Sequence, residues 1–204
     1  MSALTKERTT RILMVIIGNI FIGLGVGLFK LSALGNDPFD GMNMAMADFF
    51  HIYYPVLQII VNVFFFIFQI WLGRHLIGFG TIVNAFFLGY IAAFFYSLIP
   101  APSAFIARLL IMLVGVLVIA LGLSLYQSAD MGVAPYDALS MIMAERQKKV
   151  PYFWCRVITD AFCAIVCYVF GGIIGIGTVF SAFGFGPFIQ FFNTHVSQKL
   201  VKNH

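Results

Sequence analysis

Long apolar runs separated by short polar segments make up most of this chain. A helix needs about 20 mostly apolar residues to cross the ~30 Å hydrocarbon core of a bilayer. Several runs approach that length, and the pattern predicts six membrane-spanning helices. These predicted spans lie near residues 12–32, 56–74, 81–99, 109–127, 152–170 and 178–194.

Two of the polar interruptions carry glycine, proline and aspartate in the same order. They read "ALGNDPFDGMNM" over residues 33–44 and "ADMGVAPYDALSM" over residues 129–141. Pro38 and Pro135 suit the first position of a helix, where the missing N–H of proline costs nothing. Gly35 and Gly132 allow the tight bend that leads into it. Each interruption is therefore predicted to be a turn that opens into a short helix.

The polar ends of these short helices differ between the two copies. In the first copy Asp37 is the predicted N-cap, and Asp40 stands at the third helical position, facing the free N–H groups and the positive end of the helix dipole. The second copy keeps Asp137 but has Ala134 in place of Asp37. Each short helix is thus expected to be capped partly by its own acid.

The second short helix is too short to cross a bilayer. Its apolar portion, residues 136–144, is followed at once by "ERQKK". Nine helical residues cover only about 14 Å at ~1.5 Å per residue. The segment either enters the bilayer partway, as a re-entrant half-helix, or lies at the interface; we favour the re-entrant arrangement.

The chain repeats itself at an offset of 97 residues, the separation of Gly35 and Gly132. Chance similarity between apolar segments would match leucine and phenylalanine, whereas here the glycines, prolines and aspartates that interrupt the apolar runs match in order. The matched pairs include Gly18 with Gly115, Gly25 with Gly122, Pro38 with Pro135, Asp40 with Asp137, and Thr81 with Thr178. The chain is predicted to be one membrane domain, 1–204, containing internal repeats over 12–99 (the first half) and 109–195 (the second half).

Three full spans in each half would give the halves opposite orientations, with both termini on the same side of the membrane. If the short helices crossed fully, the halves would be parallel instead, and the count of basic residues on each side would be unchanged. The shortness of residues 136–144 favours the inverted arrangement. Lysine and arginine stay on the cytoplasmic side of membrane proteins. The expected cytoplasmic flanks carry Lys6, Arg8, Arg11, Arg146, Lys148, Lys149, Lys199 and Lys202.

Composition supports a membrane protein. The 204 residues are 61% hydrophobic, 17% aromatic and 10% charged, whereas soluble domains are about 45–50% apolar and about 25% charged. The net charge of +4 lies in membrane flanks, so nucleic acid is not an expected partner. The first apolar run lacks a small-residue cleavage site and is expected to be a retained span.

The two aspartates of the short helices are the first candidates for function, together with the aromatic residues beside them, Phe39 and Tyr136. One reading makes Asp40 and Asp137 helix caps and nothing more. The other notes that irregular backbone at membrane depth survives only inside protein or beside a wet cavity. Paired broken elements in the two halves of a transporter mark its central site. The carboxylates would then favour a neutral, zwitterionic or cationic solute, or proton coupling.

Polar residues inside the other spans supply two more candidates. Arg156 and Asp160 are four residues apart and could form an ion pair, although Arg156 lies near a span end, where snorkelling to the interface is the expected behaviour. Asp160 lies deeper and joins the site. Gln58, Asn62 and Gln69 form one amide stripe, explained equally by hydrogen bonds between helices and by a solute path; Asn62 is taken as the supporting residue.

Ordinary enzyme chemistry and cofactors are not expected. The histidines are scattered without metal-ligand spacing, and no nucleophile pattern is present. Cys163 and Cys167 share a helix face, but no histidine or carboxylate completes a zinc site, so packing is the preferred explanation. The prediction is no enzyme, no metal and no cofactor.

The run "LGLSLYQSADMGVAPYDAL", residues 121–139, resembles the signature of the YczE/YyaS/YitT-type family of bacterial integral membrane proteins. The resemblance covers nearly the whole chain. It implies a duplicated, glycine-rich membrane domain in the bacterial inner membrane and a suspected transport role. The first half departs from the signature, with Asn36 and Asp37 where the second half has Val133 and Ala134.

These observations predict an all-α polytopic membrane protein with six transmembrane helices in two inverted three-helix repeats, each with a proline-started half-helix. The expected function is a small-solute transporter or permease, with the solute between the repeats and proton coupling left open. Its expected partners are the lipid bilayer and the solute, and homo-oligomerisation is left open. A membrane accessory or scaffold protein and an aquaporin-like channel are the alternatives.

Overall fold

Helices form all the regular structure in the described part of the chain. The computed structural model describes residues 3–147 and 149–202, and Lys148 lies outside these ranges. The long helices are α1 (Ala3–Ser32), α3 (Tyr54–Leu72), α4 (Phe79–Leu98), α5 (Phe105–Ser128), α7 (Tyr152–Val169) and α8 (Ile176–Phe192). The short elements are α2 (Pro38–Phe50), the 3-10 turn η1 (Arg74–Leu76), α6 (Pro135–Gln147), the π-helical turn η2 (Asn193–Ser197) and α9 (Gln198–Lys202).

The start of α2 confirms the predicted N-cap. Pro38 opens the helix, and the carboxylate of Asp37 accepts hydrogen bonds from the backbone N–H groups of Phe39, at 3.1 Å, and Asp40, at 3.4 Å. These two N–H groups have no partner within the helix, so the cap satisfies donors that would otherwise be buried unpaired.

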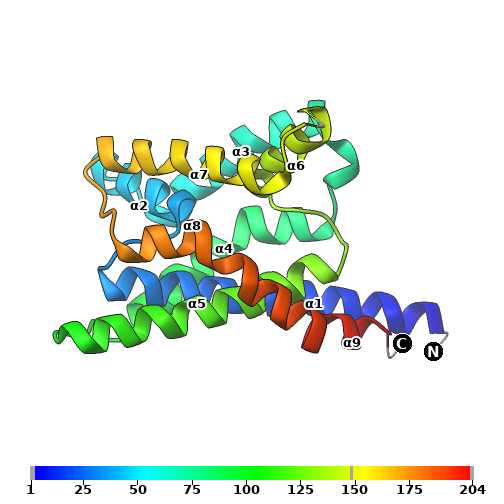
Figure 1. The fold of residues 1–204 in the computed structure, drawn as a ribbon, viewed down its shortest axis with the longest axis horizontal. Helices are drawn as coiled ribbons and strands as arrows, with labels where there is room; N and C mark the ends of the chain where they lie inside the picture. Colours follow the sequence, from blue (N-terminus) through cyan, green and yellow to red (C-terminus); the bar gives the residue numbers. More distant parts are fainter. Residues whose placement is uncertain (1–2, 148, 203–204) are drawn as a thin grey trace.

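Both short helices are 13 residues long, and each starts near the middle of the molecule. In Figure 1, α2 runs from the middle towards one end and α6 runs from the middle towards the other. α6 extends past the predicted limit at Ala144 to Gln147, because its polar last turn continues the helix at the surface. At ~1.5 Å per residue each spans about 20 Å, short of a ~30 Å hydrocarbon core.

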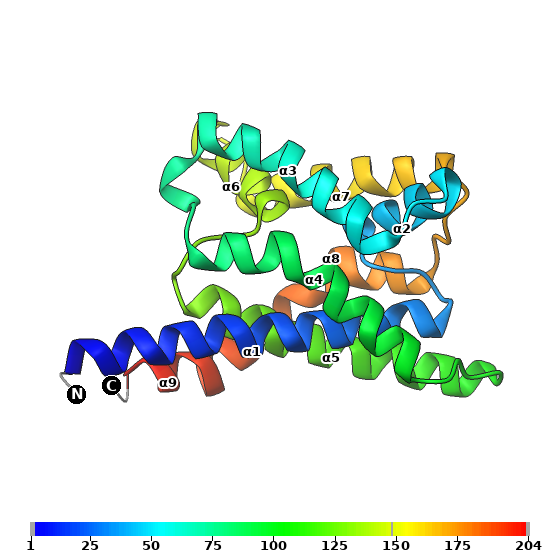
Figure 2. The same ribbon diagram turned by 180° about the vertical axis from the view of Figure 1, so that it is seen from behind.

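α1 and α5 run antiparallel and lie in close contact (Figures 1 and 2). The contact is made by glycines: a Cβ atom on Gly18 would lie 2.9 Å from the carbonyl oxygen of Gly122, and one on Gly25 would lie 3.0 Å from that of Gly115. These two contacts exchange when each residue is replaced by its partner 97 positions away. The equivalent helices of the two halves are therefore related by a local pseudo-dyad that passes through their crossing.

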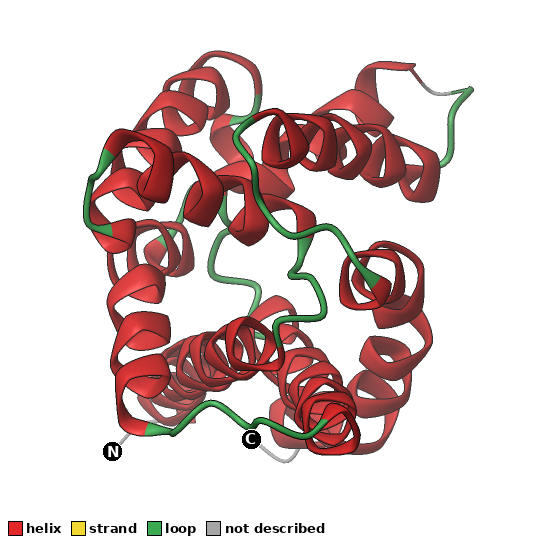
Figure 3. Ribbon diagram, turned by 90° about the vertical axis from the view of Figure 1, so that its left-hand side faces the viewer, coloured by secondary structure: helices red, strands yellow, loops and turns green. Residues whose placement is uncertain are grey.

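The helices form two interlocked groups (Figures 1 and 2). α1 and α5 pack with α4 and α8, and the other group contains α2, α3, α6 and α7. Within the second group the halves exchange elements, because α2 of the first half packs on α7 of the second, and α6 packs on α3. Seen along the long axis in Figure 3, loop segments lie in the middle of the ring of helices. Both chain ends lie at the same end of the molecule, which we call the termini end (Figure 1); the opposite end is the far end.

The chain is a polytopic membrane protein. Five of the described helices are long and apolar enough to cross a bilayer: α1 from Lys6, α3, α4, α5 and α7. Their outer faces expose large apolar side chains that water would disfavour and lipid accepts, such as Trp71, Ile106 and Tyr168, which are 77%, 71% and 75% exposed. α8 has 17 residues and continues into η2 and α9.

Candidate functional site

Matching hydrogen bonds fix the turn before α2 and the turn before α6, each to a long helix of the other half. The N–H of Gly177, in α8, donates to the carbonyl of Leu34 at 2.9 Å, and the N–H of Gly80, in α4, donates to that of Met131 at 2.7 Å. These are the same bond at the 97-residue offset. Each turn of one half is thereby held by the third long helix of the other half.

Glycine is required in both turns. Gly35 and Gly132 have φ angles of +104° and +98°, which L side chains rarely adopt. A Cβ atom on Gly35 would lie 2.8 Å from the backbone nitrogen of Gly175, and one on Gly132 would lie 2.3 Å from that of Gly78. The predicted tight bends are confirmed, and the close approach adds a reason that the sequence pattern alone did not provide.

The first turns of α2 and α6 meet at the pseudo-dyad. Phe39 and Tyr136 occupy equivalent positions, and their rings stack with centroids 4.3 Å apart and planes 10° apart. Both side chains are buried. The two half-helices therefore start face to face, and the residues that follow the aromatic rings, Asp40 and Asp137, line the same small cavity.

Asp40 is held by uncharged donors. Its carboxylate accepts a hydrogen bond from the hydroxyl group of Tyr54 at 3.1 Å and another from the side-chain amide of Gln58 at 3.0 Å. Both donors come from α3, so the carboxylate points to a neighbouring helix, and the capping bonds of α2 come from Asp37 instead. Among residues 6–147 and 149–201, no lysine, arginine or histidine lies within ion-pair distance of Asp40.

Asp137 is held by a cation. Its carboxylate forms an ion pair with the guanidinium of Arg156, which also donates to Asp160 at 3.3 Å. The hydroxyl group of Tyr136 donates to Asp160, and the guanidinium carbon lies 4.8 Å from the centre of the Tyr136 ring. The expectation that Arg156 snorkels to the interface is wrong, because the buried carboxylate of Asp160, the half-buried carboxylate of Asp137 and an aromatic face attract it inwards. The ion pair between Arg156 and Asp160 is confirmed.

A small central cavity of about 60 Å³ lies beside the stacked rings. Residues that are equivalent at the 97-residue offset line it in pairs: Ile22 with Ile119, Phe39 with Tyr136, Asp40 with Asp137, and Leu88 with Phe185. The lining also includes Asp37 and Arg156. At about 10–15 Å³ for each water molecule, the space holds a few waters or a small ion.

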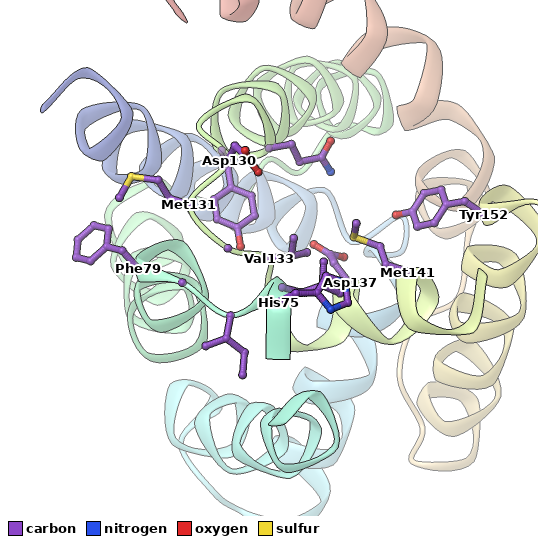
Figure 4. A pocket seen from close by; sticks show the side chains of 14 residues that line it. His75, Phe79, Asp130, Met131, Val133, Asp137, Met141 and Tyr152 are labelled. Atoms are coloured by element: carbon purple, nitrogen blue, oxygen red, sulfur yellow. The ribbon is translucent and has the colours of Figure 1, made fainter. Parts of the chain in front are cut away.

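A larger cavity of about 640 Å³, the termini-end cavity, is lined by η1 and by the adjoining parts of α4, α5, α6 and α7. Figure 4 shows Asp137 and Met141 of α6 and Tyr152 of α7 among its lining side chains. Asp137 lines both this cavity and the central one. The carboxylate therefore stands at the inner limit of a cavity large enough for a metabolite-sized ligand.

The far-end cavity is the counterpart of the termini-end cavity. It measures about 270 Å³, and several of its lining residues are the partners of those above: Phe29 for Tyr126, Gly35 for Gly132, Asn36 for Val133 and Met44 for Met141. Asp40, the partner of Asp137, is not among the residues that line it. A separate lateral cavity of about 570 Å³ between α1, α2, α3 and α4 also excludes Asp40 from its lining.

The predicted site residues are thus largely brought together. Asp40, Asp137, Phe39 and Tyr136 line the central cavity, and Asp160 reaches it through Arg156 and Tyr136. Asn62 is placed elsewhere: its amide donates to the carbonyl of Ala85 at 3.4 Å and ties α3 to α4.

Several residues of the site gave no signal in the sequence. Tyr54, Tyr126 and Tyr152 lie in or beside apolar runs, where a tyrosine is an ordinary interfacial or packing residue. Gln58 was part of the amide stripe, and a donor four residues after Tyr54 on one helix face could have suggested a shared acceptor. Asp40, which accepts the hydrogen bond of Gln58, could not be identified as that acceptor without knowing that α2 packs on α3.

The three cysteines are buried and free, and Cys163 and Cys167 pack beside Phe39 and Tyr136. In the part of the chain that the structure describes, no group of three or more histidine, cysteine, aspartate or glutamate side chains is placed to hold a metal ion. The site is built from carboxylates, one guanidinium, hydroxyl groups and aromatic rings.

Comparison with known proteins places this arrangement in a family. A family model described as "Family of unknown function (DUF6198)" matches residues 9–194. The chain belongs to this family. It is 27% identical over 177 residues to an uncharacterized protein of Haemophilus influenzae, covering 84% of this chain and 78% of that protein. No solved structure matches this chain.

Two further family relatives come from Bacillus subtilis. The uncharacterized membrane protein YczE is 27% identical over 175 residues, covering 85% of this chain and 81% of YczE. The uncharacterized protein YyaS is 24% identical over 194 residues, covering 92% of both chains. The resemblance seen in residues 121–139 is thereby confirmed for a YczE/YyaS-type family.

Proposed function

We propose that this protein is a small-solute transporter built from two inverted repeats of three spans each. The antiparallel course of α1 and α5, equivalent helices of the two halves, supports the inversion. α8 serves as the sixth span: its 17 residues, about 25 Å at ~1.5 Å per residue, are lengthened by the helical turns η2 and α9.

The proposed orientation places both termini in the cytoplasm, in a bacterial inner membrane. Both chain ends lie at the same end of the molecule, together with η1, the last turn of α6 and α9 (Figures 1 and 2). These segments carry most of the basic residues, including Arg11, Arg74, Arg146 and Lys199. Cytoplasmic flanks of membrane proteins carry an excess of lysine and arginine, so the termini end is assigned to the cytoplasm.

The observation that carries the transport proposal is the meeting of the two half-helices beside a small central cavity that carboxylates of both halves line. Phe39 and Tyr136 stack there, and both Asp40 and Asp137 line the cavity. Broken elements in equivalent positions of two inverted repeats mark the central site of many transporters. Buried carboxylates at this depth are expensive to maintain, which favours a role in binding or proton transfer over a purely structural one.

The two unequal cavities support an alternating mechanism. The termini-end cavity reaches Asp137, whereas the lining of its counterpart at the far end does not include Asp40. In this proposal the solute path reaches the central carboxylates from the termini end. In the alternate state each half would adopt the conformation that the other half has here. The far-end cavity would then be the larger one, and Asp40 would face it.

Asp40 is the proposed proton acceptor. Its hydrogen-bond partners are neutral and it forms no ion pair with another described residue, whereas Asp137 is paired with Arg156. A carboxylate in this position can take up a proton from one side and release it to the other as the path alternates. The chemistry at the site is binding and proton transfer, with no enzymatic step.

The test is a flux measurement with matched variants. The purified protein is reconstituted into liposomes that contain a pH-sensitive dye, and solutes selected by a thermal-shift screen of metabolites are added outside. We expect a solute-dependent pH change. Asp40→Asn should abolish it, and Asp137→Asn should reduce solute flux about tenfold or more. Glu7→Gln, which removes an acid from an exposed pair with Arg11, should leave it unchanged.

Two results would contradict the proposal. If both aspartate variants fold and a demonstrated flux persists, the carboxylates are structural only. If no solute produces flux and the protein instead co-purifies with a stable partner, it is an accessory or scaffold protein. Solute flux that is fast, unsaturable and independent of pH would favour a channel.

A further inference from the structure

The termini-end cavity has the size and lining of a ligand site. Its volume of about 640 Å³ lies within the ~300–1,000 Å³ range of sites for small molecules. Phe79, Tyr126 and Tyr152 contribute aromatic rings, and Leu76, Met131 and Met141 contribute apolar surface. A ligand that fills this cavity would therefore contact aromatic faces as well as the carboxylate of Asp137.

Tyr126 supplies a hydroxyl group that has no acceptor among the described residues. The side chain is 1% exposed, and its hydroxyl oxygen is buried without a hydrogen bond of ordinary geometry. The backbone N–H of Ala134 approaches the oxygen, which leaves the O–H proton free to donate. A buried hydroxyl without an acceptor is unfavourable, and a ligand in the cavity that Tyr126 lines would provide one.

The charges of the cavity favour a cation. Asp130 and Asp137 line it, and no lysine or arginine is among its lining residues. His75 also lines the cavity, and its Nε2 is hydrogen-bonded to the carboxylate of Glu145 at 3.1 Å. Arg156 lines the central cavity and is not among the residues that line this one. Its single positive charge is shared between Asp137 and Asp160, so with Asp130 the carboxylates outnumber it three to one.

We infer that the termini-end cavity binds a small organic cation that also carries a hydrogen-bond acceptor. Its ammonium group would lie near Asp137 and the aromatic rings of Tyr126 and Tyr152, where charge and cation–π attraction act together. Its acceptor would receive the hydrogen bond of the Tyr126 hydroxyl. This inference names the solute class of the proposed transporter and rests on that function.

Choline is a suitable probe because it combines a quaternary ammonium with a hydroxyl oxygen. Binding of radiolabelled choline to the purified protein is measured by scintillation proximity. Two competitors isolate the charge: 3,3-dimethyl-1-butanol replaces the ammonium nitrogen with carbon, and glycine betaine adds a carboxylate. We expect saturable binding of choline and at least about tenfold weaker competition by both, because each lacks the net positive charge.

Variants test the residues. Asp137→Asn should weaken choline binding about tenfold, and Tyr126→Phe, which keeps the ring and removes only the hydroxyl, should weaken it about threefold to fivefold. Glu7→Gln should bind as the unaltered protein does. If Asp137→Asn does not yield folded protein, Tyr126→Phe still decides the role of the cavity.

The outcomes separate this inference from the transport proposal. Equal competition by the neutral analogue, tighter binding of glycine betaine, or unchanged binding by Tyr126→Phe would overturn the cation assignment. Absence of choline binding in a preparation that shows solute-dependent flux would overturn the solute class and leave transport standing. Choline binding with the expected variant effects, but without choline flux in liposomes, would support the site and contradict transport.

Discussion

The two half-helices share a backbone arrangement and differ in charge. Phe39 stacks on Tyr136, and the turns before them, at Gly35 and Gly132, have nearly the same φ angle. Beyond the stack the likeness ends. Asp40 is held by uncharged donors of α3, whereas its partner, Asp137, pairs with a guanidinium of α7.

The likeness lies in the backbone and the difference lies in the side chains around the carboxylates. The glycine turns and the helix crossings are fixed by backbone contacts that tolerate no side chain, so both copies retain them. The side chains around the carboxylates are under no such limit and have diverged. At these positions one half has a carboxylate paired with a guanidinium beside a large cavity, and the other has a carboxylate held by uncharged donors.

The largest expected effect comes from removing the cation that only the second half possesses. Arg156→Gln leaves Asp137 and Asp160 without their counter-charge at a buried site. Breaking a buried ion pair from one side costs about 3–5 kcal/mol, so we expect a strong decrease in the free energy of unfolding. Thermal unfolding can be followed with a dye that reacts with the three buried cysteine thiols as they become accessible.

Two further variants sharpen that result. Arg108→Gln removes an arginine that donates to the carbonyl of Pro102 in the segment before α5, and it should cost less than about 1 kcal/mol. Combining Arg156→Gln with Asp137→Asn and Asp160→Asn removes the unbalanced charges and should restore much of the lost stability. Equal destabilisation by Arg156→Gln and Arg108→Gln would mean that the charge difference between the halves has no structural weight.

The turns offer a test of the likeness of the halves. Gly132→Ala and Gly35→Ala each place a Cβ atom against backbone at a positive φ angle. Backbone strain and overpacking each cost about 1–3 kcal/mol, so a loss of about 2–4 kcal/mol is expected for either variant. The closer contact at Gly132 predicts that its variant is the less stable of the two. Gly186→Ala is the control, because a Cβ atom on Gly186 would have no atom within 4 Å. Gly171→Ala does not serve as a control, because the φ angle of Gly171 is positive as well.

A loss in one turn but not in the other would contradict the pseudo-dyad as a description of the scaffold. The unfolding assay described above measures both variants under the same conditions. If Gly186→Ala destabilises as much as either turn variant, the effect is one of helix geometry and not of close backbone contact.

Much of this scaffold follows from local sequence patterns. Apart from α1, which starts at Ala3 and not near residue 12, the long apolar runs predicted helices within a few residues of the observed limits. Helix length in a membrane is set by hydrophobic thickness. Pro38, with Asp37 before it, marked the start of α2 for a local steric and hydrogen-bonding reason. The repeated glycines, prolines and aspartates predicted a duplication, and several glycines 97 residues apart make matching contacts in the structure.

The interior of the site could not be predicted in the same way, because its contacts join residues far apart in the sequence. Arg156 lies near the start of a span, where snorkelling is the ordinary outcome, and only the packing of α6 on α7 brings Asp137 to it. The uncharged donors of Asp40 depend in turn on the packing of α2 on α3. The termini-end cavity is lined by five elements and has no local signature.

The smallest expected effect comes from a variant that makes the two stacked rings identical. Tyr136→Phe converts the second half to the residue of the first and removes the hydrogen bond from the hydroxyl group to Asp160, while the stack on Phe39 stays. A bond to a charged group contributes about 1.5 kcal/mol at the low end of its range, and we expect a loss of about that size. Tyr168→Phe, on an exposed face of α7, is the control and should change stability by less than about 0.5 kcal/mol.

A double-mutant cycle isolates the contribution of this bond. Tyr136→Phe, Asp160→Asn and the double variant are measured by the same unfolding assay, and the coupling free energy should be about 1 kcal/mol. A coupling near zero would show that Asp160 is fixed by Arg156 alone. The hydroxyl of Tyr136 would then be free to serve the central cavity, and the guanidinium of Arg156 would be the group that fixes the acids of the second half.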